Sequence, residues 1–157
     1  MSNLVEHKKA RLNYETLEEF EAGLELVGHE VKALRARHGR LEGAHIIVRP
    51  TSSRAATSGN EAYIVGMSIP PYQVANTPGS YDPERTRRLL LTQKELATLA
   101  DSEQQKGLTI VPLAVYSKGS KLKLRLAIAR GRKKFDKRAA LKERDTKRDM
   151  QRTLKNQ

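Results

Sequence analysis

A strict alternation of apolar with polar or small side chains over residues 121–129 constrains the fold of this chain more than any other feature. A period of two is typical of a β-strand with one buried face, and the other face of this strand would be basic. The preceding stretch, 108–116, is rich in β-branched residues, and the connecting segment 117–120 contains Gly119. Because glycine accepts the positive φ of a tight turn, the two stretches predict a β-hairpin. Pro112 cannot donate a ladder hydrogen bond and predicts an edge or a bulge there.

Further strands are predicted along the first half of the chain. Apolar stretches at 44–49 and 62–67 have strand-like composition, and the polar segment 50–60 between them is expected to be a mobile loop. Weaker strand patterns occupy 9–15 and 20–27.

Helices are fewer. Thr92 and Glu95 have the spacing of a capping box, and the helix that they start should run until Gly107. A second helix is predicted over 30–37, and the proline-rich stretch 70–86 predicts a long irregular connection. At least six short strands with two or three helices in about 130 residues favour a single, mainly β domain, a closed or nearly closed antiparallel barrel.

The charge is concentrated at the C-terminus. The 157 residues carry 30 Lys and Arg against 18 Asp and Glu, a net charge of +12, and residues 130–157 alone contribute +8. A basic excess of this size is typical of a protein that binds a polyanion, nucleic acid before an acidic membrane. The tail has too few apolar residues to offset its ordering entropy, so alone it should be disordered or a fraying helix. A tail that only aids solubility is the alternative.

Several kinds of chemistry are excluded or disfavoured. The chain has no cysteine, which rules out disulfides, thiol nucleophiles and Cys-ligated zinc or iron–sulfur clusters. The four histidines lack metal-ligand spacing, and no phosphate loop, nucleophile elbow or dinucleotide fingerprint occurs. No leader peptide or membrane span is evident. We therefore expect a cytoplasmic binding protein without metal, cofactor or membrane, and not an enzyme.

A series of short motifs runs in order along almost the whole chain. The motifs lie at 8–11, Tyr14, 20–24, 28–36, 82–91, 106–113, Tyr116, 118–119, Lys123 and 127–138. In this order they resemble the SsrA-binding protein (small protein B, SmpB) family of bacterial trans-translation factors. The resemblance implies an oligonucleotide-binding (OB) type barrel over residues 1–130, and a basic tail over 131–157 that becomes helical on the ribosome.

The resemblance also implies the partners. The barrel would bind the tRNA-like domain of transfer-messenger RNA (tmRNA) and deliver it to stalled ribosomes, and the tail would enter the empty mRNA path and meet mainly small-subunit rRNA. An elongation factor on the same tmRNA is a further partner that it allows, and the protein is expected to be monomeric.

Site residues follow by matching positions. The barrel contacts to tmRNA would be Lys9, Arg11, Tyr14, Glu21, Lys32, Arg35, Arg87, Arg88, Leu90 and Lys123. Glu21 cannot bind phosphate, but it can accept hydrogen bonds from base or 2′-hydroxyl donors. Without the resemblance, a surface acid paired with Lys or Arg would be the simpler interpretation of Glu21. Leu90 stands in a run of three leucines, of which one or two at most should face outward.

In the tail, Gly131 would be a hinge. Phe135, at a position where the family usually has His or Tyr, could stack on a base. Met150 and Leu154 would be the apolar contacts of the induced helix. The remaining contacts to the ribosome would be Arg130, Arg132, Lys133, Lys134, Asp136, Lys137, Arg138, Lys142, Arg144, Lys147 and Arg148.

Two other functions remain open. Composition equally permits a general ribosomal or RNA-chaperone protein with an OB-type barrel. Such a protein would bind many RNAs with similar affinity, and the affinity would depend on salt concentration in the same way for each RNA. A phosphodiester-cleaving enzyme built on Glu18, Glu19 or Glu21 ranks far behind, because nothing in the sequence separates their pKa values.

Overall fold

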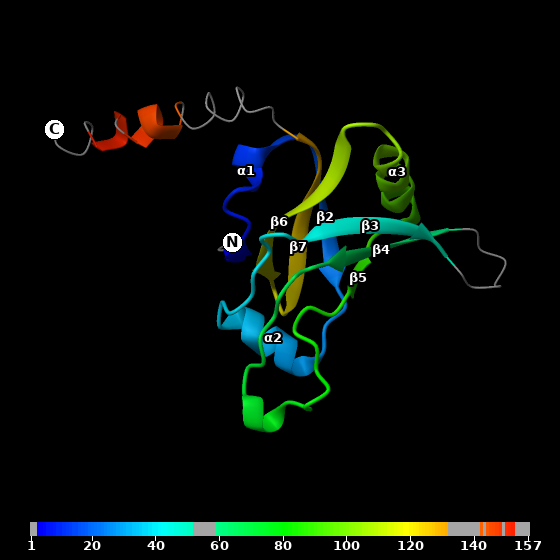
Figure 1. Ribbon diagram of the computed structural model, residues 1–157, viewed down its shortest axis with the longest axis vertical. Coiled ribbons are helices and arrows are strands. Elements are labelled where there is room, and N and C mark those ends of the chain that lie inside the picture. Colours follow the sequence, from blue (N-terminus) through cyan, green and yellow to red (C-terminus); the bar gives the residue numbers. More distant parts are fainter. Residues whose placement is uncertain (1–2, 52–58, 132–141, 143, 149, 153–157) are drawn as a thin grey trace.

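Seven strands form a single antiparallel sheet in the computed structural model, which describes residues 3–51, 59–131, 142, 144–148 and 150–152. Their order in the sheet is β1-β6-β7-β2-β5-β4-β3 (Figure 1). The two ends of this order approach each other, since β3 packs against β6, so the sheet is rolled into a barrel-like body. The bounds are β1 Asn3–Glu6, β2 Tyr14–Leu24, β3 His45–Pro50, β4 Asn60–Val65, β5 Arg87–Leu90, β6 Leu108–Lys118 and β7 Lys121–Gly131. The predicted class is confirmed.

The predicted hairpin is the longest pairing of the sheet. β6 and β7 pair from Leu108 opposite Arg130 to Lys118 opposite Lys121, and the turn contains Gly119 at φ +62°. The register shifts between Pro112 and Ala114, which is the bulge that Pro112 predicted. The leucines of β7 are buried in the core, so its basic residues face outward as expected.

Strand β2 differs from the prediction. The two weak strands expected at 9–15 and 20–27 are replaced by one strand from Tyr14 to Leu24, preceded by the single helical turn α1, Ala10–Asn13. The reason is tertiary: Ala10 is buried against the outer side of β6 and β7, and this contact favours a turn where the sequence alone suggested a strand. Pairing on both sides, with β7 and β5, stabilises the Glu-rich strand β2.

The longer helices cap the ends of the body. α2, Gly28–Arg35, and α3, Gln93–Glu103, lie at opposite ends of the rolled sheet in Figure 1. The capping box of α3 is confirmed, because the Glu95 amide donates to Thr92 Oγ1 at 3.2 Å and the Thr92 amide donates to the Glu95 carboxylate at 3.2 Å. The connection 70–86 is irregular apart from one 3-10 turn, Val74–Asn76.

Most of the loop expected at 50–60 lies outside the described residues, as does most of the tail. Where the tail is described, at 142, 144–148 and 150–152, the backbone is helical and every side chain is exposed. Within the described part of the chain, no helix is long and apolar enough to cross a membrane.

Candidate nucleic-acid interface

The outward face of β7 and its neighbours brings two predicted site residues, Lys123 and Leu90, to either side of Gly23. Lys123 of β7 lies opposite Gly23 of β2, and Gly23 lies opposite Leu90 of β5. Leu90 is 53% exposed, while Leu89 beside it is buried, so one leucine of the run faces outward as predicted. A Cβ on Gly23 would lie 3.2 Å from the Leu90 Cβ, so glycine allows β5 to present Leu90 here.

A groove of about 300 Å³ runs beside Leu90. Its walls come from β2, the segment between β2 and α2, α2 itself, β5, the β6–β7 turn and the start of β7. The lining residues are Gly23, Leu24, Leu26, Val31, Leu90, Ser120, Lys121, Leu122 and Lys123. Arg35 of α2 donates hydrogen bonds to Ser117 Oγ at 3.4 Å and to the Ser120 carbonyl at 3.0 Å, which ties the helix to the turn. An apolar floor with lysines at the rim suits a folded RNA, whose backbone is anionic and whose sugars and bases offer apolar surface.

Glu21 of β2 faces outward beside this groove. The Tyr116 hydroxyl of β6 donates a hydrogen bond to Glu21 Oε2, and Lys118 Nζ donates to Oε1 at 3.0 Å. The Arg125 guanidinium lies 5.0 Å from the centre of the Tyr116 ring, in a cation–π arrangement. The hydrogen bonds from Tyr116 and Lys118 lower the pKa of Glu21 below its ordinary value. The carboxylate is therefore ionised at neutral pH and able to accept hydrogen bonds from RNA.

Arg87 occupies a different place from the one predicted. Its side chain is 0% exposed and lies on the inner side of β5, where its Nε donates to Glu30 Oε2 at 2.7 Å. Its other nitrogens donate to the carbonyls of Met67 at 2.7 Å and Pro83 at 3.0 Å. With no surface to offer RNA, Arg87 is a structural residue that joins α2 to the loops before β5. The prediction of an RNA contact at Arg87 is corrected on this ground.

The other predicted cations near the groove are exposed. Lys32 lies on α2, and Arg88 follows Arg87 on the outward side of β5, 3.8 Å from a carboxylate oxygen of Glu61. Both lie on elements that contribute to the wall of the groove, Lys32 next to the lining residue Val31 and Arg88 two residues before the lining residue Leu90.

Three predicted residues lie at the far end of the sheet. Lys9 precedes α1 and is exposed, Arg11 lies within α1, and Tyr14 begins β2 opposite Gly131 of β7. Gly23 follows Tyr14 by nine positions along β2, which at about 3.3 Å per residue is about 30 Å. The predicted barrel contacts thus form two groups, one at the groove and one where the tail leaves the body.

The start of the tail is also shifted. Gly131, predicted as a hinge outside the barrel, is the last residue of β7 and pairs with Tyr14, and Arg130 pairs with Glu15. The described members of the predicted tail contacts, Lys142, Arg144, Lys147, Arg148 and Met150, are exposed and helical. The others lie outside the described residues: Arg132, Lys133, Lys134, Phe135, Asp136, Lys137, Arg138 and Leu154.

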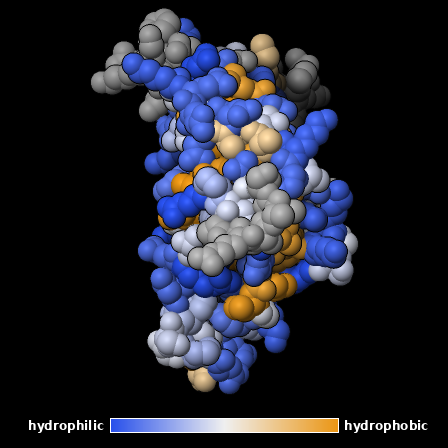
Figure 2. Space-filling view, turned by 90° about the vertical axis from the view of Figure 1, so that its right-hand side faces the viewer, coloured by the Kyte–Doolittle hydropathy of each residue, from blue (hydrophilic) through white to orange (hydrophobic). Residues whose placement is uncertain are grey.

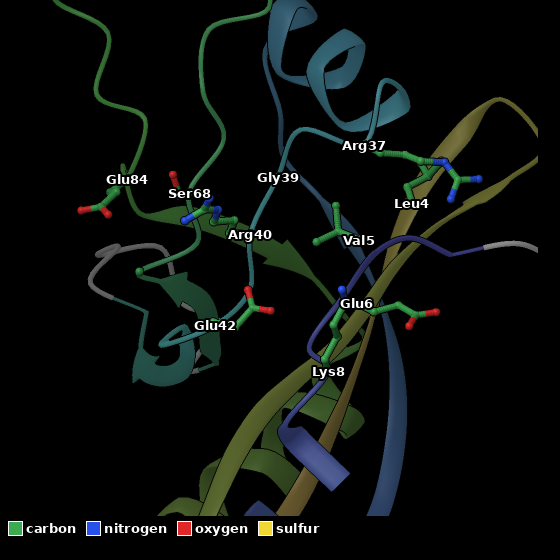
Figure 3. A pocket seen from close by; sticks show the side chains of 11 residues that line it. Leu4, Val5, Glu6, Lys8, Arg37, Gly39, Arg40, Glu42, Ser68 and Glu84 are labelled. Carbon is green, nitrogen blue, oxygen red and sulfur yellow. The ribbon is translucent and has the colours of Figure 1, made fainter. Parts of the chain in front are cut away.

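A second concave surface, of about 700 Å³, lies along β1 (Figure 3). Lys8, Arg37 and Arg40 contribute three positive charges to its lining, and Glu6, Glu42 and Glu84 contribute three negative ones. With balanced charge it does not attract a polyanion, unlike the rim of the groove. On the face shown in Figure 2, apolar residues reach the surface in separate patches among hydrophilic ones. Among the described residues, no group of three His, Asp or Glu side chains could hold a metal ion.

Four side chains that lie in the groove or around Glu21 were not among the site residues predicted from the sequence. Lys121 and Arg125 share the outward face of Lys123, and the period of two in β7 was enough to identify them. Tyr116 and Lys118 come from β6, and only the hairpin register brings them to Glu21.

Known proteins resemble this chain along almost its whole length. The family model described as SmpB protein matches residues 4–156. An SsrA-binding protein of Oleidesulfovibrio alaskensis is 45% identical over 151 residues, which are 96% of this chain and 91% of that protein. One of Gloeothece citriformis is 41% identical over 152 residues, 97% of this chain and 92% of that protein. A solved structure described as "tmRNA-SmpB: a journey to the center of the bacterial ribosome" matches with a TM-score of 0.61 and 38% identity, over 82% of this chain and 84% of that one.

Proposed function

The chain belongs to the SmpB protein family, and on that premise we propose that it is a tmRNA-binding factor of trans-translation. It binds the tRNA-like domain of tmRNA and delivers the RNA to stalled ribosomes. It works in the cytoplasm as a monomer, by binding rather than by catalysis. The observation that carries this proposal is identity of 41–45% to SsrA-binding proteins over 96–97% of the chain.

The groove and the outward face of β7 are proposed as the main contact to the tRNA-like domain. Lys32, Arg35, Arg88 and Lys123 would bind the RNA backbone, and Leu90 would make an apolar contact with a base or sugar. Glu21 would accept hydrogen bonds from an amino or 2′-hydroxyl group. The exposure of Leu90 and the ionised state of Glu21 support these roles.

The second group, Lys9, Arg11 and Tyr14, is proposed to hold the same RNA about 30 Å away, next to the root of the tail. The tail itself is proposed to enter the empty mRNA path and bind small-subunit rRNA. The helical backbone and full exposure of its described residues support a segment that is available for such a partner.

Recovery of RNA on the tagged full-length protein tests the function. At moderate salt the wild-type protein should recover tmRNA well above other RNAs of a bacterial lysate. Leu90→Ala should reduce this recovery, whereas Val74→Ala, which also truncates an exposed apolar side chain but on the loop away from the groove, should leave it unchanged.

Two results would contradict the proposal. Absence of tmRNA from the wild-type sample would remove its basis. Similar recovery of many RNAs, with a common salt dependence, would favour the alternative of a general RNA chaperone.

A further inference from the structure

Glu21 of β2 accepts a hydrogen bond from Tyr116 of β6, which lies on the other side of the intervening strand β7. The sheet order places β7 between β6 and β2, so Tyr116 and Glu21 come from strands about 10 Å apart. The Tyr116 ring is 1% exposed and passes beneath Arg125 of β7, and its hydroxyl emerges at Glu21 Oε2. A buried side chain thus ends in a donor aimed at an exposed carboxylate.

The other neighbours of Glu21 hold it less firmly. Lys118 bonds Oε1 at 3.0 Å, but its side chain is 54% exposed, and exposed ion pairs contribute little. Lys123 acts on the carboxylate only through its charge, and Arg125 faces the Tyr116 ring. Tyr116 is therefore the one neighbour described here that combines burial with a direct hydrogen bond to Glu21.

We propose that Tyr116 is a positioning residue for RNA recognition, whose hydroxyl fixes the Glu21 carboxylate in the orientation that accepts hydrogen bonds from the RNA. This inference rests on the proposed function. A glutamate side chain free on the surface loses rotamer entropy on binding, and a carboxylate already held by a buried donor loses less. Each carboxylate oxygen has two lone pairs, so Oε2 can keep the tyrosine while the carboxylate accepts from RNA.

The protonation states agree with this arrangement. Burial and the hydrogen bond to Glu21 raise the pKa of Tyr116 to about 12, so its hydroxyl keeps the proton that it donates at neutral pH. The hydrogen bond from Tyr116 is the largest influence that lowers the pKa of Glu21, ahead of Lys118 and the charge of Lys123.

Tyr116→Phe in the full-length protein tests the inference, because it removes the hydroxyl and keeps the buried ring. Its Kd for the isolated tRNA-like domain should rise about two- to tenfold, the range expected when binding has to immobilise a side chain that the wild-type protein already holds in place. In a Glu21→Ala background the same substitution should change Kd less than about twofold, because the group that it positions is gone. Tyr72→Phe, which removes the hydroxyl of an exposed tyrosine in the 70–86 connection, is the matched control and should bind as the wild type does.

A second measurement separates positioning from a general loss of structure. In Tyr116→Phe, the pKa of Glu21 followed by NMR should rise toward its ordinary value of 4.5. An unchanged Kd, or an equal loss of affinity with and without Glu21, would overturn the inference. Failure of the wild-type protein to prefer the tRNA-like domain over an unrelated RNA would instead overturn the proposed function, while the Glu21 titration would still report on the contact between Tyr116 and Glu21.

Discussion

Glu30 and Arg87 are charged side chains with no exposed surface, and they lie 57 positions apart in the sequence. The Glu30 carboxylate accepts hydrogen bonds from Arg85, from Arg87 and from the Val27 amide at 3.0 Å. The Tyr81 hydroxyl lies 3.0 Å from its Oε2. Glu30 belongs to α2 and Val27 is the N-cap of that helix, whereas Tyr81 and Arg85 precede β5 and Arg87 begins it, so this network fixes the helix and the strand that border the groove.

Glu30→Gln should therefore destabilise the protein. The substitution keeps the size of the side chain but leaves the buried Arg87 without its counter-charge, and breaking such a pair typically costs about 3–5 kcal/mol. Chemical denaturation at neutral pH measures the change in the free energy of unfolding. Glu84→Gln is the control, since Glu84 is exposed and its loss should have little effect. Equal effects of the two substitutions would contradict the role given to Glu30.

The same carboxylate predicts a pH dependence. Burial alone would raise the pKa of Glu30, but the hydrogen bonds from Arg85, the Val27 amide and Arg87 outweigh it and lower the pKa from 4.5 to about 2. Between these values the unfolded chain binds the proton and the folded protein does not, so the stabilisation is complete above pH 4.5 and is lost as the pH falls toward 2. Denaturation experiments at several pH values in this range measure the free energy of unfolding. This free energy should fall more steeply with decreasing pH for the wild type than for Glu30→Gln. The same slope for both proteins would show that Glu30 is not the group responsible.

At the scale of elements, α3 illustrates structure that local sequence specifies. Thr92 and Glu95 bond each other's amides, as the capping box predicted. The helix ends at Glu103, four residues before the predicted stop at Gly107, which takes a φ of +85° in the following turn. The helix packs on β3, β4 and β6, and its Glu103 carboxylate accepts a hydrogen bond from the Val48 amide of the edge strand β3 at 2.8 Å. The capping box thus stabilises α3, which also covers the exposed edge of the sheet at β3.

Thr92→Ala should cost about 1 kcal/mol in the free energy of unfolding, because it leaves an amide of the first turn without its acceptor. Thr98→Ala is the matched control within the same helix. The Thr98 hydroxyl bonds the Lys94 carbonyl, which already belongs to the helix, and alanine favours helical backbone, so stability should be unchanged or slightly higher. A loss at Thr98 as large as at Thr92 would mean that the cap is not the cause.

Other elements depended on contacts far away in the sequence. α1 is too short to have a periodic signal, and it exists where Ala10 meets Val111, Leu113, Ala127 and Ala129. In β5 buried and exposed residues alternate, but one of the two buried positions is occupied by Arg87. The sequence of β5 therefore lacks the alternation of apolar and polar residues that predicts a strand. Neither element could be predicted before the sheet was assembled.

At the scale of the whole molecule, the body and the tail are proposed to perform separate tasks. Because Gly131 pairs with Tyr14 inside the sheet, the division that preserves the body falls after Gly131. A protein ending at Gly131 should bind the tRNA-like domain with nearly wild-type affinity and fail to rescue stalled ribosomes. Filter binding and a rescue assay measure the two properties. Loss of both together would contradict the separation of tasks.

The sequence by itself determined the strands with clear periodicity, the capping box, the basic excess of the tail and the resemblance to the SmpB family. The first three are local or additive properties that neighbouring residues are enough to reveal, and the resemblance is the sum of short motifs that are each local. The tertiary structure decided which charges face outward. Arg87 and Arg88 are adjacent in sequence, yet one is buried on Glu30 and the other is exposed, and Tyr116 reaches Glu21 across a strand. Such outcomes depend on pairing between distant segments, because the cost of burying a charge is offset only by the partner that folding brings to it.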